Sequence, residues 1–170
     1  RLSYKEGNPD DFNFKRSYSL SGDIRQYFSP GRKVTITAGG DLLFTYTNDS
    51  ITSPHNYYFA GGPEITFARA IPFTGFHQGE IAVDRFASIK FDLDFELLKD
   101  LHLSILTNFA AAREPGSVKD LSLLGGYGIG LGYMSIIGPL KIGLVQGFSN
   151  KERYFNLVKG YISIGFNFYQ

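Results

Sequence analysis

Apolar and polar residues alternate at every second position through most of the chain, which is the period of a β-strand. The clearest run is ASIKFDLDFELL, beginning at Ala87. Its apolar residues are Ile89, Phe91, Leu93, Phe95 and Leu97, and its charged residues are Lys90, Asp92, Asp94 and Glu96. This pattern predicts one apolar face and one charged face. Since no helical period of any length appears, the pattern predicts an all-β chain.

The same reading predicts strands connected as an antiparallel up-and-down meander. The predicted strands lie near 12–28, 32–47, 56–61, 80–97, 101–112, 124–135, 139–149 and 158–169. Several of them are far longer than the strands of soluble proteins, which cluster at about 5 to 6 residues. A tilted strand needs about 9 to 11 residues to cross the hydrocarbon layer of a membrane.

Two structures fit such alternating strands. In a soluble β-sandwich or lipocalin-like binder, the apolar rows meet in a common core. In a transmembrane barrel they face lipid, and the polar rows line an enclosed interior. Strand length favours the barrel, as do aromatic clusters near strand ends such as Tyr57 to Phe59. We expect an all-β, antiparallel, up-and-down transmembrane β-barrel with about eight strands in this chain.

The amino-acid composition excludes several kinds of partner and site. The chain has 20 Gly, 16 Phe and 11 Tyr, no Cys and a net charge of +1. Without a block of charge or any cysteine, we expect no nucleic-acid partner, disulfide or thiolate metal site. His55, His77 and His102 lie in separate segments, so no metal or cofactor is predicted. Glycine recurs at every second position from Gly126 to Gly132, which predicts a bent strand whose inner face other groups approach closely.

The charged row predicts the wall of a wet lumen rather than an enzyme site, because no serine or histidine stands beside the carboxylates in a recognisable arrangement. We expect these carboxylates to pair with cations on neighbouring rows, or else to line a charged pore. The predicted wall residues are Arg85, Lys90, Asp92, Asp94, Glu96, Asn108 and Lys141.

The loop at 62–78 is too apolar to extend into water, so it must pack against something. It is predicted either to plug the lumen as a lid or to contact another protein outside the cell. The predicted lid residues are Gly61, Gly62, Arg69, Ile71, Pro72, Phe73, Gly75 and Phe76.

The end of the chain resembles the C-terminal insertion signal of bacterial outer-membrane barrels. The residues that carry this resemblance are Tyr161, Ile164, Phe166 and Phe168. More widely, the order SPHNYYFAGG, IPFTGF, GYGIGLGYMSIIGPLKIGLVQGF and YISIGFNF resembles the C-terminal half of the barrel of the outer-membrane protein 85 superfamily. The resemblance implies a barrel of about sixteen strands in the bacterial outer membrane, of which residues 1–170 form one half.

In that family an Arg-Gly-Phe motif at the tip of the lid locks onto an acidic residue of the wall. Here Thr74 precedes Gly75 and Phe76, and Asn108 stands where the acid is expected. This departure, together with IPFTGF, resembles the barrels attached to patatin-like phospholipases. Arg1 opens the chain without a signal peptide, so we expect a mature protein or the later part of a longer one.

The function implied is a non-enzymatic outer-membrane barrel that anchors, translocates or inserts a polypeptide or an attached periplasmic lipase module. Any lipase chemistry would lie in a domain outside these 170 residues. The expected partners are the lipid bilayer, lipopolysaccharide, the barrel-assembly machinery and a preceding periplasmic domain or another chain. A barrel-housed carrier or enzyme for hydrophobic small molecules is the alternative, although a charged lumen suits it poorly.

Overall fold

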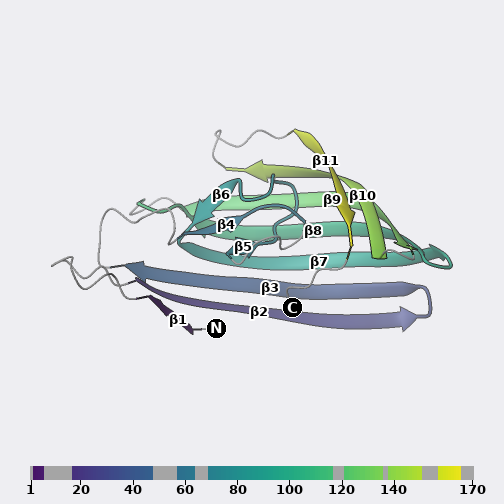
Figure 1. The fold of residues 1–170 in the computed structure, drawn as a ribbon, viewed down its shortest axis with the longest axis horizontal. Coiled ribbons are helices and arrows are strands. Elements are labelled where there is room, and N and C mark those ends of the chain that lie inside the picture. The colour runs from purple at the N-terminus through teal and green to yellow at the C-terminus, as the bar shows by residue number, and fades with distance from the viewer. Residues whose placement is uncertain are drawn as a thin grey trace.

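The computed structural model describes residues 2–5, 17–47, 57–63, 69–116, 121–135, 138–150 and 157–165. Eight antiparallel strands form one large sheet in the order β1-β2-β3-β7-β8-β9-β10-β11 (Figure 1). Their bounds are β1 Leu2–Lys5, β2 Ser17–Gly31, β3 Val34–Thr47, β7 Arg85–Leu98, β8 Leu101–Arg113, β9 Leu121–Ser135, β10 Gly138–Ser149 and β11 Val158–Ile164. None of the described residues forms a helix long and apolar enough to cross a membrane.

A second, small sheet interrupts the meander between β3 and β7. It consists of β4 (Tyr58–Ala60), β5 (Ala70–Ile71) and β6 (Ile81–Val83), in the order β5-β4-β6. β4 runs parallel to β5 and antiparallel to β6. Figure 1 shows this small sheet lying against the long strands, towards one end of them.

The predicted all-β, antiparallel, up-and-down sheet is confirmed. Three details of the prediction are wrong. The segment 56–61 is not a strand of the large sheet, because within the described residues β4 pairs only with β5 and β6. The predicted strand 80–97 divides at Asp84 into β6 and β7, which belong to different sheets. The short strand β5 was not predicted.

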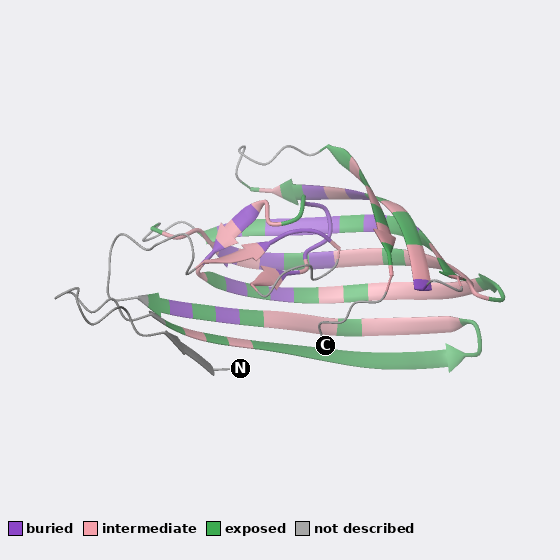
Figure 2. Cartoon of the chain, viewed as in Figure 1, coloured by how far each residue is buried: buried purple, intermediate pink, exposed green. Residues whose placement is uncertain are grey.

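The apolar rows of the large sheet are exposed on its convex face. Ile24 on β2 is 73% exposed and Ile162 on β11 is 76% exposed, and Phe91 on β7 and Ile164 on β11 are exposed as well. Large apolar side chains cannot remain in water over so wide a face, so lipid contact explains this surface better than a soluble sandwich does. The strands alternate between exposed and more buried residues, as the colours in Figure 2 show.

The buried core lies between the small sheet and the concave face of the large one. Its members are Leu43, Ala60, Ile71, Phe73, Phe76, Ile81, Val83, Phe86, Ala110, Ala112 and Leu124. In Figure 2 the buried colour gathers on the small sheet and on the strands behind it.

The connections between neighbouring strands differ in length at the two ends of the large sheet. Only two residues join β2 to β3 (32–33), β7 to β8 (99–100) and β9 to β10 (136–137) at one end, whereas the connections at the other end are longer. In outer-membrane barrels the short turns are periplasmic and the long loops are extracellular. The small sheet lies at the end with the longer connections, which would be the extracellular end in a barrel of that kind.

Candidate functional site

The chain between β3 and β7 folds back onto the concave face, and we call its described residues, 57–63 and 69–83, the lid segment. Its backbone is hydrogen-bonded mainly to itself. Phe59 N donates to Arg69 O over 3.0 Å, Gly61 N to Ile71 O over 3.1 Å, and Phe73 N to Gly62 O over 2.8 Å. Because its polar backbone groups are satisfied internally, the segment can present apolar side chains to the wall.

Phe73 is the centre of the contact between the lid segment and the wall. Its side chain is fully buried, at 0% exposure. Its ring centroid lies 5.7 Å from that of Phe76 in the lid and 5.7 Å from that of Phe86 on β7, the latter edge to face. Such aromatic pairs add to the stabilisation from burial. All eight predicted lid residues lie in this segment, with Pro72 half-buried.

The tip of the lid segment fits against glycines of the wall. A Cβ atom at Gly126 on β9 would lie 1.8 Å from the Thr74 carbonyl oxygen. A Cβ atom at Gly147 on β10 would lie 2.5 Å from the Gly75 carbonyl oxygen. Gly75 itself has φ = 100°, a left-handed conformation that favours glycine. The sequence prediction that glycines of β9 admit close approach is confirmed at Gly126, where the group that approaches is the lid backbone.

An ionic latch is not formed at this tip in the described residues. Asn108, which is 3% exposed, lies beside Gly126, and its Oδ1 has no hydrogen-bond partner in the described part of the chain. Arg69 lies away from the tip, where β5 begins, with its guanidinium 6.0 Å from the centre of the Tyr58 ring. The tip is therefore held by shape and apolar burial.

An ion pair fastens the other end of the lid segment to β11. Lys159 Nζ lies 2.7 Å from Glu80 Oε2, and the two side chains are 10% and 25% exposed. The same ammonium lies 5.4 Å from the centre of the Phe76 ring. Glu80 also accepts a hydrogen bond from the backbone of His77. Since β11 is an edge strand of the described sheet, this pair connects the lid to that edge.

Replacing Lys159 with methionine is expected to loosen the lid. Methionine keeps the apolar stem against Phe76 but removes the charge that Glu80 binds, at a cost of about 1 to 3 kcal/mol in docking free energy. The chain has no cysteine, so a Thr74→Cys reporter is unique, and its maleimide labelling rate should rise about tenfold. Lys99→Met, at an exposed turn position, is the matched control. Unchanged labelling in the Lys159 variant would contradict the pairing.

The concave wall carries most of the predicted polar row. Lys90, Asp92, Asp94 and Glu96 alternate with the outward-facing apolar residues of β7, and Asn108 and Lys141 lie on the same concave face, on β8 and β10. Arg85 does not belong to this row, and its prediction is wrong. It shares the outward face with Ile89 and Phe91, where its guanidinium lies 4.7 Å from the centre of the Phe44 ring.

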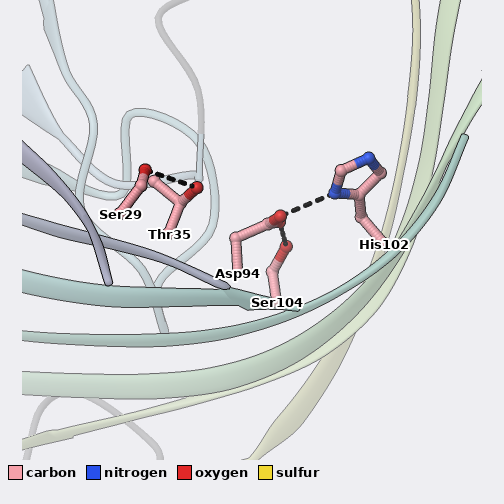
Figure 3. Close-up of polar contacts among 5 residues, drawn as sticks. All are labelled: Ser29, Thr35, Asp94, His102 and Ser104. Atoms are coloured by element: carbon pink, nitrogen blue, oxygen red, sulfur yellow. Dashed lines mark hydrogen bonds and ion pairs between the residues drawn. The ribbon is translucent and has the colours of Figure 1, made fainter. Parts of the chain in front are cut away.

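The pairing on the wall differs from the expected one. Lys90 Nζ lies 2.7 Å from Asp41 Oδ2 on β3, and Ser88 donates a 2.8 Å hydrogen bond to the same oxygen. Asp94 accepts from Ser104 over 2.8 Å and lies 2.6 Å from His102 Nδ1 (Figure 3). Asp94 stands between the histidine and the serine, so the histidine is not placed to activate Ser104 as a nucleophile. A cavity of about 230 Å³ beside them is also lined by Lys141 and Tyr161.

The predicted insertion residues divide between faces. Ile164 lies outward with Ile162, whereas Tyr161 lies on the concave face, with its ring against Gly143 and its hydroxyl beside Gly130. Tyr161 is therefore not on the same row as Ile164, because their positions differ by three and alternate residues of a strand point to opposite faces. Phe166 and Phe168 lie outside the described residues.

Sequence reasoning missed Asp41, Glu80, His102 and Lys159 as members of these contacts. A charged residue on a polar row can be recognised from alternation, but its partner depends on strand register and on how the lid folds back. Glu80 and Lys159 are 79 residues apart in the chain. No short-range pattern connects them.

Comparison with known proteins gives one family. A model described as the OMP85 superfamily matches residues 3–168. No curated protein matches the chain.

Proposed function

The chain belongs to the OMP85 superfamily, and on that premise we propose that it contributes to an outer-membrane barrel that inserts or translocates polypeptides. The observation that carries this proposal is the docked lid segment. A wall that served only as an anchor would need no glycine recesses at Gly126 and Gly147 to receive the Thr74 and Gly75 backbone. These contacts suit a plug that occupies the concave side and is released when a polypeptide passes.

The nature of the lid contacts supports a releasable plug. Among the described residues, the lid is held by burial of apolar side chains, by steric fit at its tip and by the ion pair between Glu80 and Lys159. None of these contacts is covalent, and the wall on the same face carries charged groups such as Lys90 and Asp94. A polar wall suits an extended polypeptide better than an apolar small molecule, which requires an apolar pocket.

A narrower form of the proposal is that the barrel anchors or exports a periplasmic patatin-like lipase module, with any lipase chemistry in that module. Its support is the sequence IPFTGF at the lid tip, with Thr74 and Asn108 in place of the family's arginine and acid. In either form, the partners are the outer-membrane lipids and the machinery that assembles barrels.

The proposal is tested by tethering the lid. The variant Glu80→Cys with Lys159→Cys is reconstituted into liposomes and treated with a bifunctional maleimide that contains a reducible disulfide. An unfolded outer-membrane polypeptide is then added, and its insertion is measured as heat-modifiable mobility on a gel. Insertion by the unlinked protein is expected to exceed that of empty liposomes several-fold, to stop when the lid is tethered, and to return on reduction.

The control places the same linker chemistry on two exposed turn positions, Arg32→Cys and Lys99→Cys, at the other end of the sheet. Translocation is read in parallel as protection of a soluble polypeptide from external protease. If neither insertion nor protection exceeds that of empty liposomes, the proposal is wrong. Activity that persists in the tethered protein would show that the lid need not move.

A further inference from the structure

The convex face has a groove near the extracellular end, separate from the lid site. It has a volume of about 730 Å³ and is lined largely by apolar side chains. Ala87 on β7 and Ala111 on β8 are register partners on the outward face, and their small side chains form the floor. The walls are formed by Leu42, Ile89, Phe109, Leu123 and Phe148.

One wall of the groove is built on a glycine. Phe148 lies over Gly125, where a Cβ atom would be only 2.0 Å from the ring. This position brings the Phe148 ring to a centroid distance of 6.2 Å from that of Phe109, edge to face. The two rings stand beside the alanine floor, so the depression is preformed rather than dependent on flexible side chains.

A cation stands at the extracellular end of this groove. Arg85 lies two residues before Ala87 on the same face of β7, about 7 Å along the strand. Its register partner Arg113 is bound to Asp84 by two guanidinium nitrogens, so that charge is neutralised. Arg85 itself is exposed and rests on the ring of Phe44. No acidic side chain in the described part of the chain pairs with it.

We propose that this groove and Arg85 form a seat for a phosphorylated lipid of the outer leaflet, with lipid A as the occupant. An acyl chain lies on the Ala87 and Ala111 floor, and a phosphate binds the guanidinium of Arg85, whose planar donors match phosphate oxygens. The order of the two parts fits the membrane, with the cation at the headgroup end and the apolar groove towards the hydrocarbon. This seat rests on the proposed outer-membrane location, but not on transport.

The test is native mass spectrometry of the purified protein titrated with bisphosphorylated lipid A. Arg85→Gln is expected to lower the affinity about tenfold, because it removes a charge-assisted contact. Ala111→Phe is expected to lower it comparably by filling the floor. The matched controls are Arg32→Gln in the turn at the opposite end and Ala38→Phe on the outward face of β3, and both should bind as the original chain does.

Phosphate-free lipid A and phosphatidylglycerol are titrated in parallel. Equal affinity for phosphate-free lipid A, or unchanged binding by Arg85→Gln, would overturn the seat. Tighter binding of phosphatidylglycerol would overturn the choice of lipid A. Because binding is measured without any transport step, a protein that fails the insertion assay but binds lipid A through Arg85 refutes only the proposed function.

Discussion

Replacing Phe73 with alanine is expected to release the lid segment from the concave face. The side chain is fully buried between Phe76 and Phe86, and removing such a ring costs about 3 to 5 kcal/mol. When this free energy is lost from the docking of the lid segment onto the wall, maleimide labelling of a Thr74→Cys reporter in the folded protein should accelerate by about 100-fold or more. The large sheet should persist, because its strands are joined by their own hydrogen-bond ladders.

The matched control is Phe91→Ala, which removes the same ring from the outward face of β7. This variant loses a ring that contacts the surrounding lipid or detergent and not the lid, so the labelling rate of the cysteine at position 74 should not change. Circular dichroism of both variants would verify that the strands remain. Slow labelling in the Phe73 variant with an intact sheet would mean that the lid is held mainly by its backbone fit and the Lys159 pair.

Alternation alone was sufficient to predict the faces of the long strands. The row that includes Ile89 and Phe91 is exposed on the convex face, and the row that includes Lys90 and Asp94 faces the concave side. The prediction of strand pairing failed for β4, because a residue pattern does not show which strand a segment pairs with. Tyr58–Ala60 was predicted as part of a strand of the large sheet, yet it pairs within the lid, because the connection to β7 folds inward.

The wrong prediction of the face on which Arg85 lies has a different cause. A charge near the start of a strand suggests the polar row, but its position relative to Phe86 and Ser88 places it on the apolar one. At the end of a strand, a long cation can lie on the outward face and reach the polar surface of the membrane, so the charge does not determine the face. Counting residues from the centre of the strand would have corrected this prediction.

The lid site could be predicted only in part. The apolar loop and its glycines suggested a packed lid, and the glycines of β9 suggested close approach. Which glycine meets which lid residue depends on the register of β8, β9 and β10, and that register is set by the whole sheet. The pair of Glu80 and Lys159 depends on the same long-range arrangement.

The glycine recesses lead to the sharpest prediction. Gly126→Ala adds one methyl group whose carbon would lie 1.8 Å from the Thr74 carbonyl oxygen, so the lid tip must withdraw. Such overpacking costs about 1 to 3 kcal/mol. Labelling of the Thr74→Cys reporter should therefore rise about tenfold or more, and the ion conductance of the reconstituted protein should rise with it.

Gly132→Ala on the same face of β9 is the matched control, because its added carbon has no neighbour closer than 3.7 Å. The two variants share the same chemical change and the same small gain in strand preference, so they differ only in what lies above the glycine. Equal labelling in both would mean that the tip of the lid does not rest on Gly126. A rise confined to position 126 would identify the recess as the element that seats the lid, since no charge or hydrogen-bonding group has been altered.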